Sequence, residues 1–303
     1  MSADVSVVGS INLDHTTVTS AFPGPGETIL GESVATSVGG KGANQAVAAA
    51  LAGAHVSIVG SVGSDPDGDR ALAALSAAGV SVDRVRRCDD VPTGTAWITV
   101  ADGENKIIVV PGANEDVTID GADTEASVTL CQLEIPMDVV ASAAGRAGLF
   151  ILNAAPATEI TPALLRQCDV LVVNEHELAT ITSELIGSVN SIVTASRSLL
   201  DAGVRAVITT VGAQGAVLCQ PGGASLTAAP RVPVVDTTGA GDAFCGVLAA
   251  RLAAGDVLSV AVKWGVAAGS HAVQAPSAQS SYPDGAQLKA AVEAIAPAKE
   301  LTS

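Results

Sequence analysis

A glycine turn before a predicted helix contains residues that could take part in phosphoryl chemistry. Residues 236–244 read Asp-Thr-Thr-Gly-Ala-Gly-Asp-Ala-Phe and lead from an apolar run into a predicted helix over 240–254. The N–H groups of a glycine turn that opens a helix point outward, and the helix dipole adds partial positive charge there. The amides of residues 239–242 therefore suit a transferring phosphoryl group, with Asp242 within reach of a substrate hydroxyl. Asp242 fits equally well as an acid that only caps the helix.

A second glycine-rich turn spans residues 39–45 and reads Gly-Gly-Lys-Gly-Ala-Asn-Gln, directly before an Ala-rich predicted helix over 41–53. Glycines let the backbone approach a ligand closely, and Lys41 and Asn44 lie three residues apart on the first helical turn. The spacing differs from the GxxxxGK[ST] of a Walker A loop. The alternative is a solvated lysine in a tight turn. Because the chain has only five lysines, we favour a ligand contact for Lys41.

Two pairs of polar residues follow predicted strands. Asn12 and Asp14 lie on one face of an extended segment, where an amide and a carboxylate can bind a vicinal diol. An Asx-turn is the alternative for this pair. Asn174 and Glu177 begin a predicted helix and could organise the waters that a nucleotide-bound Mg²⁺ retains. The alternative is that these acids only match the helix dipole. The histidines are scattered, so the sequence does not predict a metal bound directly by the protein.

These clusters, in this order, resemble the ribokinase-like, or PfkB, family of carbohydrate kinases over essentially the whole chain. Residues 39–45 are similar to the first family signature and residues 236–242 to the second, which is highly specific. Residues 153–157 and 174–177 also match the family pattern. The residues that match the ribose-contacting set of the family are Asn12, Asp14, Gly40, Lys41, Asn44, Glu134 and Asp242.

The resemblance implies an ATP-dependent sugar kinase that phosphorylates the 5-hydroxyl of D-ribose to give D-ribose 5-phosphate. Asp242 would be the base, and an anion hole would be formed by Gly239, Ala240 and Gly241 together with the amide of residue 242. The nucleotide would contact Asn174, Glu177, Thr210, Gly212 and Gly241. The alternatives are a kinase for another sugar or a nucleoside, such as 2-deoxyribose, fructose or adenosine, and a non-catalytic sugar sensor of the same fold.

The resemblance also implies three cofactors, namely ATP, Mg²⁺ and an activating monovalent cation, usually K⁺. The cation would be held mainly by backbone oxygens of Asp236, Thr238, Val273 and Pro276. The chain departs from the family in this loop, because Pro276 and Ser277 stand where a basic residue and a glycine are common. Since backbone ligands survive side-chain changes, the sequence still predicts the site.

The elements that position these residues alternate between short apolar runs and Ala/Leu-rich segments. Five runs predict buried strands, at Val5–Val8, Val56–Val59, Leu149–Leu152, Val170–Val173 and Ala206–Thr210. Predicted helices cover about 41–53, 67–78, 136–146, 188–202, 240–254 and 285–295. This alternation predicts an α/β fold, with a mostly parallel central sheet covered by helices on both faces. The family fold has the same architecture with a small β-sheet lid.

Residues 11–38 and 92–112 instead alternate between apolar and polar types and contain turn signals, so they predict a smaller antiparallel sheet. We expect this sheet to form a lid over a main domain of residues 1–10, 39–91 and 113–303. Period-two counting from Ala96 places Trp97 on the face that points away from the sugar. In the family, the lid often pairs with the lid of a second subunit, which implies a homodimer.

Composition narrows the remaining classes of protein. The 303 residues carry 15 Lys+Arg and 31 Asp+Glu, and the formal net charge of −16 disfavours nucleic-acid binding. A hydrophobic content of 48% excludes a disordered chain. No apolar run is long enough to predict a membrane span, and the first residues carry no secretion signal. The five scattered cysteines suit reduced thiols, so we expect a cytoplasmic protein.

Overall fold

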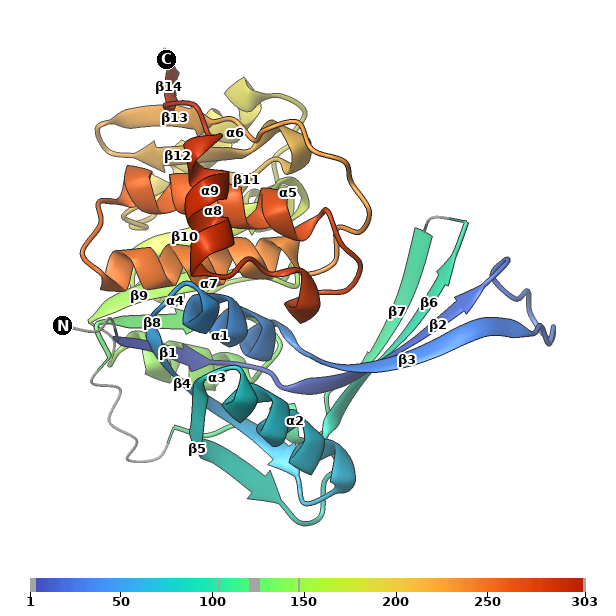
Figure 1. Cartoon of the computed structure of the whole chain (residues 1–303). Helices are drawn as coiled ribbons and strands as arrows, with labels where there is room; N and C mark the ends of the chain where they lie inside the picture. Colours follow the sequence, from blue (N-terminus) through green and yellow to red (C-terminus); the bar gives the residue numbers. More distant parts are fainter. Residues whose placement is uncertain (1–3, 103, 120–125, 147, 302–303) are drawn as a thin grey trace.

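The main element of the computed structural model is a ten-stranded sheet, as far as the described residues 4–102, 104–119, 126–146 and 148–301 show (Figure 1). In spatial order its strands are β14 (Lys299–Leu301), β13 (Gly223–Thr227), β12 (Ala216–Gln220), β11 (Val207–Thr210), β10 (Val170–Asn174), β9 (Leu149–Asn153), β8 (Val128–Cys131), β1 (Asp4–Val8), β4 (His55–Gly63) and β5 (Val80–Cys88). Pairing from β5 to β11 is parallel, and β12 to β14 are antiparallel. The prediction of a mostly parallel sheet is confirmed.

Helices cover both faces of this sheet. Successive strand residues point to opposite sides, so each face carries its own apolar side chains, which the helices bury. Val7 belongs to one buried cluster and Val8 to the other. The first face carries α1 (Lys41–Leu51), α2 (Pro66–Ala77), α7 (Ala240–Ala253), α8 (Leu258–Ala272) and α9 (Gly285–Glu293). The second carries α3 (Met137–Ala144), α4 (Pro162–Leu165), α5 (Glu175–Thr182) and α6 (Val189–Asp201). None of the helices in the described ranges is long and apolar enough to cross a membrane.

Some elements were absent from the sequence prediction. No helix was expected over 258–272, where α8 forms. The segment contains Gly265, Gly269 and three valines, which have lower helix propensity than alanine and weaken its helical signal. Strands β5, β8, β12 and β13 were also missed, as were the short 3₁₀ helices η1 (Gly112–Asp116), η2 (Gly212–Gln214) and η3 (Gln279–Ser281).

A small sheet of four strands extends from the main body (Figure 1). In spatial order it contains β3 (Gly31–Gly39), β2 (Asn12–Thr19), β6 (Gly94–Ala101) and β7 (Glu104–Val110). The expectation that this sheet is antiparallel was wrong for its central pair, because β2 and β6 are parallel. These two strands follow β1 and β5, which run in the same direction in the main sheet, so both leave it with the same orientation.

Within the small sheet, β6 shows the predicted alternation. Ala96 is buried, whereas the Trp97 side chain is 55% exposed and stacks on His15 with ring centroids 4.6 Å apart.

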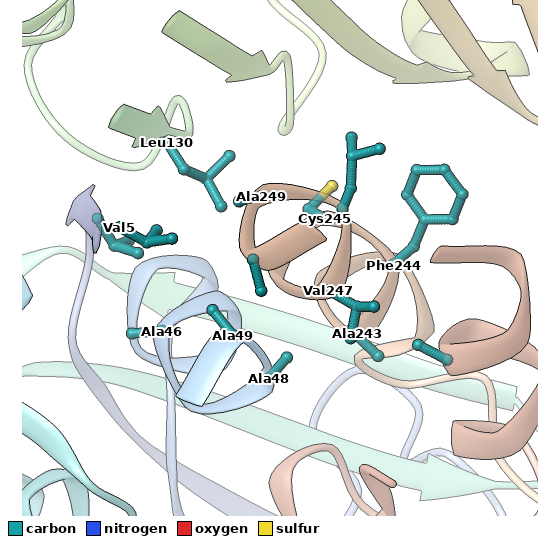
Figure 2. Close-up of a cluster of buried hydrophobic side chains, with 14 of the residues drawn as sticks. Val5, Ala46, Ala48, Ala49, Leu130, Ala243, Phe244, Cys245, Val247 and Ala249 are labelled. Carbon is teal, nitrogen blue, oxygen red and sulfur yellow. The ribbon is translucent and has the colours of Figure 1, made fainter. Parts of the chain in front are cut away.

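Helices α1 and α7 pack closely through small side chains (Figure 2). A Cβ atom added at Gly246 of α7 would overlap the carbonyl oxygen of Gln45 and lie 2.7 Å from the Cβ atom of Ala48. The absence of a side chain at Gly246 therefore lets the two helices approach. This approach brings the first turns of α1 and α7 together at the carboxyl edge of the parallel strands.

Gly246→Ala should destabilise the protein, because the neighbouring atom is backbone and cannot move aside without shifting α1. Overpacking of a tight core costs about 1–3 kcal/mol. Chemical denaturation should show a loss of this size. Gly187→Ala is the matched control, since a Cβ atom there meets nothing within 4 Å. Equal stability of the two variants would contradict the close approach.

Candidate active site

Two adjoining cavities lie at the carboxyl ends of the parallel strands. One of about 220 Å³ is lined by Lys41, Glu177 and Asp242, among others. The other, of about 580 Å³, is lined mostly by small and apolar residues of segments 210–215 and 229–237 and of α7 and α8, with Gly212 among them. Both cavities share Thr210, Thr237 and Gly241, so they form one continuous cleft. A further cavity of about 700 Å³, beside His55 and Arg84, lies at the opposite ends of the strands and contains none of the predicted site residues.

Asp242 lines the 220 Å³ cavity, and its carboxylate is bound by side chains of the neighbouring helix α1. Gln45 Nε2 donates to Oδ1 at 2.8 Å, and Asn44 Nδ2 donates to Oδ2 at 3.0 Å. No side-chain capping bond forms at the start of α7, so Asp242 is not a simple helix cap. Burial raises the pKa of Asp242, while Lys41 and the two amides oppose that shift. The sequence analysis did not identify Gln45, although it directly follows Asn44 in the glycine-rich turn.

Two further carboxylates converge on this position. Glu134 Oε2 accepts from Ser10 Oγ at 2.6 Å and from the backbone N–H of Lys41 at 3.0 Å. Burial, and then the charges of Glu134 and Asp242, raise the pKa of Asp14 to about 7. The Oδ1 atom of Asp14 is buried without a hydrogen-bond partner, which leaves an acceptor for a hydroxyl group.

Lys41 supplies the positive charge among these acids. Burial alone would lower the pKa of Lys41, but nearby carboxylates, led by that of Asp242, raise it above its ordinary value. Lys41 follows Gly40, whose φ of 85° is a conformation that glycine adopts readily. The structure therefore brings Lys41 together with Glu134, Glu177 and Asp242, which are far apart in the sequence.

Asn12 lies beside this group but is bound on one side. Its Oδ1 accepts from Asn114 Nδ2 at 2.7 Å, and Asn114 Oδ1 in turn accepts from the backbone of Ile11 at 2.8 Å. Asn114 fixes the start of the small sheet and was not identified from the sequence.

The turn before α7 contains the residues predicted to form the anion hole. Gly239 has a φ of 74°, which starts the helix in the left-handed region. The N–H of Ala240 makes a long bond of 3.3 Å to the carbonyl of Thr237, so it is partly engaged by the turn. Gly241 lines both cavities.

Asn174 and Glu177 form a capping box at the start of α5. Asn174 Oδ1 accepts from the N–H of Glu177, and Glu177 Oε2 accepts from the N–H of Asn174, both at 2.8 Å. These two residues therefore do serve the start of the helix, which was the alternative to a role in organising the waters of Mg²⁺. Both residues also line the 220 Å³ cavity with Lys41, and burial raises the pKa of Glu177 against the opposing effects of Asn174 and Lys41.

The two loops predicted to hold a monovalent cation lie side by side. The Asp236 carboxylate accepts from the N–H groups of Thr238 and Ser277, each at 2.9 Å. These bonds lower the pKa of Asp236, although burial alone would raise it. Ser277 has a φ of 71°, a left-handed conformation that glycine adopts more readily. The Val273 carbonyl already accepts from the N–H groups of Val235 and Asp236.

Comparison with known proteins assigns this chain to a family. Residues 2–285 match the model of the pfkB family carbohydrate kinases. A ribokinase of Schizosaccharomyces pombe is 37% identical over 92% of this chain and 95% of its own length. A deoxyribokinase of Salmonella typhimurium is 34% identical, with shares of 92% and 95%. The chain belongs to the pfkB family of carbohydrate kinases, as its motifs predicted.

The fold comparison agrees with the family assignment. The structure of Arabidopsis thaliana ribokinase complexed with ribose and ATP superposes with a TM-score of 0.90 at 32% identity. The match covers 97% of this chain and 99% of the Arabidopsis chain. The predicted ribokinase-like α/β architecture is thereby confirmed.

Asp14→Asn should stabilise the protein at alkaline pH. The pKa of Asp14 is raised from 3.8 to about 7 on folding, so the unfolded state loses this proton first as the pH rises. The contribution of Asp14 therefore becomes less favourable between these two values. At 1.36 kcal/mol per pKa unit the penalty reaches up to about 4 kcal/mol.

Thermal denaturation at several pH values tests this expectation. The Tm of Asp14→Asn should exceed that of the wild type at pH 8, and the difference should shrink toward pH 4. The exposed Asp83 provides the control variant Asp83→Asn, which should follow the wild type throughout. If Asp14→Asn had the same Tm as the wild type at pH 8, the ionised carboxyl group of Asp14 would not destabilise the folded protein, and the prediction would be wrong.

Proposed function

We propose that this carbohydrate kinase transfers the γ-phosphoryl group of ATP to the 5-hydroxyl of D-ribose, giving D-ribose 5-phosphate and ADP. The observation that carries the proposal is the buried carboxylate of Asp242, which lines a polar cavity continuous with an apolar cleft of about 580 Å³. Asp242 also lies at the start of α7, where helix-dipole charge favours anions. The relatives named ribokinase support ribose as the sugar, and the Arabidopsis ribokinase complexed with ribose and ATP supports ATP as the donor.

The sugar would be bound by the polar groups around Asp14. The six residues proposed to fix its hydroxyls, besides Asp242, are Asn12, Asp14, Gly40, Lys41, Asn44 and Glu134. The buried, unpartnered oxygen of Asp14 supports this role, because a sugar hydroxyl would satisfy it. Binding also favours the ionised carboxyl group of Asp14, which can accept from two hydroxyls.

Asp242 would take the proton of the 5-hydroxyl as the phosphoryl group is transferred. The amides of Gly239, Ala240 and Gly241, with that of residue 242, would stabilise the phosphoryl oxygens. A helix start alone would weaken an aspartate as a base, but burial raises the pKa of Asp242 and so strengthens it. Phosphoryl transfer also has a loose transition state, so positioning contributes most of the rate.

ATP would occupy the apolar cleft beside Thr210 and Gly212, with its phosphates toward Gly241. Asn174 and Glu177 would hold Mg²⁺ through its waters, and oxygen donors at the edge of the phosphate cavity fit such an ion. When bound, Mg²⁺ neutralises charge on the phosphates. The five cysteines are free and buried, and we propose that the enzyme acts in the cytoplasm, where thiols stay reduced.

The small sheet would act as a lid, formed by residues 11–38 and 92–112, over the domain of residues 1–10, 39–91 and 113–303. Several of its apolar side chains are open to solvent, including Val34 at 75% and Ile108 at 68% exposure. Exposed sheet faces of this kind are usually covered. We propose that a second copy of the chain covers them, so that the enzyme is a homodimer.

Asp242→Asn should lower kcat by about 10²–10⁴-fold, the usual contribution of a positioned acid–base group. The KM for ATP should change little, because the amides that face the phosphates remain. Asp284→Asn is the matched control, since Asp284 only caps α9. Steady-state ADP release with ribose would measure both variants. Near-normal turnover of Asp242→Asn would overturn the mechanism.

A sugar panel should give kcat/KM in the order ribose, 2-deoxyribose, adenosine. The exposed Trp97 is stacked on His15, so it is not available to hold a nucleoside base. Loss of one hydroxyl would leave a buried oxygen of Asp14 unpaired, and specificity of this kind can be large. The deoxyribokinase relative makes 2-deoxyribose the second candidate substrate. Adenosine as the best substrate would contradict the proposal.

Potassium should raise kcat over sodium or choline at equal ionic strength. The backbone oxygens proposed as ligands belong to Asp236, Thr238, Val273 and Pro276. Carbonyl oxygens in two adjoining loops fit a large monovalent ion, although the Val273 oxygen is already engaged twice. The bound ion would order the turn before α7. Equal activity in the three salts would rule out the site.

A further inference from the structure

The carboxylate of Asp242 sets the orientation of a chain of buried amides. An ionised carboxylate only accepts hydrogen bonds, so the amide groups facing it must present their N–H₂ ends. Gln45 does so, and the same Nε2 atom also donates to Asn153 Oδ1 at 2.9 Å. The Oε1 atom of Gln45 consequently faces the other way, where Gln132 Nε2 donates to it at 2.6 Å.

A second amide pair repeats this arrangement on the other carboxylate oxygen. Asn44 donates its Nδ2 to Asp242, which directs its Oδ1 away from the carboxylate. Gln279 Nε2, in η3, donates to that Oδ1 at 3.0 Å. Each amide that holds Asp242 is thus prevented from flipping by another amide. A flip of either would place an oxygen against the carboxylate.

Gln132 makes this contact at a cost to the fold. Its Oε1 atom is buried without a hydrogen-bond partner, and a buried unpaired carbonyl lowers stability. The side chain also requires Gly9 beside it, because a Cβ atom at that position would overlap Gln132 Oε1. An apolar residue of similar length would remove this unpaired atom but leave Gln45 Oε1 without its donor, so one buried oxygen would stay unpaired in either case. What the glutamine adds is the orientation of Gln45.

We propose that Gln132 and Gln279 are positioning residues for phosphoryl transfer. Gln132 fixes the side-chain amide of Gln45, and Gln279 fixes that of Asn44. Through these two amides the carboxylate of Asp242 is held in one orientation toward the reacting hydroxyl. This inference rests on the proposed role of Asp242 as the base.

Gln132→Met is the first test, because methionine keeps the length of the side chain and removes its polar atoms. Its kcat with ribose should fall about tenfold, since a small misplacement of a catalytic group has effects of this order. The KM for ATP and the Tm should stay close to those of the wild type. Thr129→Val is the matched control. It removes another buried, unpaired polar atom from β8, the strand that Gln132 directly follows, outside the amide chain, and should leave kcat unchanged.

Gln279→Met provides an independent variant, because Gln279 lies in a partly exposed 3₁₀ helix and its replacement disturbs the core less. It should also lower kcat with little change in Tm. If Gln132→Met fails to fold, the result with Gln279→Met decides the proposal. Wild-type kcat in a folded Gln132→Met or Gln279→Met variant would overturn the role assigned to that glutamine.

The same substitutions in an Asp242→Ala background separate positioning from general damage. Single-turnover measurements should show that Gln132→Met costs nothing further once Asp242 is gone, whereas an equal further loss would overturn the proposal. The outcomes also distinguish the two levels of inference. Turnover retained by Asp242→Ala would reject the base itself. An inactive Asp242→Ala with normal kcat in both glutamine variants would reject only the positioning role.

Discussion

Burial of the Asp242 carboxylate is the constraint on which the site depends. A charge removed from water has to be compensated by hydrogen bonds and by an opposite charge. The amides of Asn44 and Gln45 supply the bonds, and Lys41 supplies the charge. All three come from the first turn of α1, so that helix has to lie against α7. The close packing at Gly246 makes this possible.

The compensation is incomplete, and the imbalance is consistent with a site built for a ligand. Glu134, Glu177 and Asp242 share one lysine, and burial together with the charges of Glu134 and Asp242 raises the pKa of Asp14 to about 7. An oxygen of Asp14 and one of Gln132 are buried without partners. Ligand hydroxyls can relieve the first of these. The oxygen of Gln132 stays unpaired, and this cost in stability is compensated only by the orientation that Gln132 gives to Gln45.

The parallel sheet explains why distant segments meet here. Strands β1, β8, β9, β10 and β11 run in one direction, so their carboxyl ends deliver residues to the same edge. Loops after β1 and β8 carry Ser10 and Glu134, and β10 ends at Asn174. The same direction explains the small sheet, whose central strands β2 and β6 continue from β1 and β5, two strands that run the same way on either side of β4, and are therefore parallel themselves.

Local sequence was sufficient for those features whose cause is local. The glycine turns, the polar residues on them and the apolar alternation predicted the family, the parallel sheet, and Lys41 and Asp242 as site residues, because backbone conformation and hydrophobic period are encoded within a few residues. Helix α8 was missed because its glycines and valines weaken the local helical signal. Whether Asp242 caps its own helix or is bound by another one, and which glutamines orient its partners, depended on contacts between segments up to 235 residues apart. Such contacts form only once the chain has folded, since hydrogen-bond direction is set by the atoms that packing brings face to face.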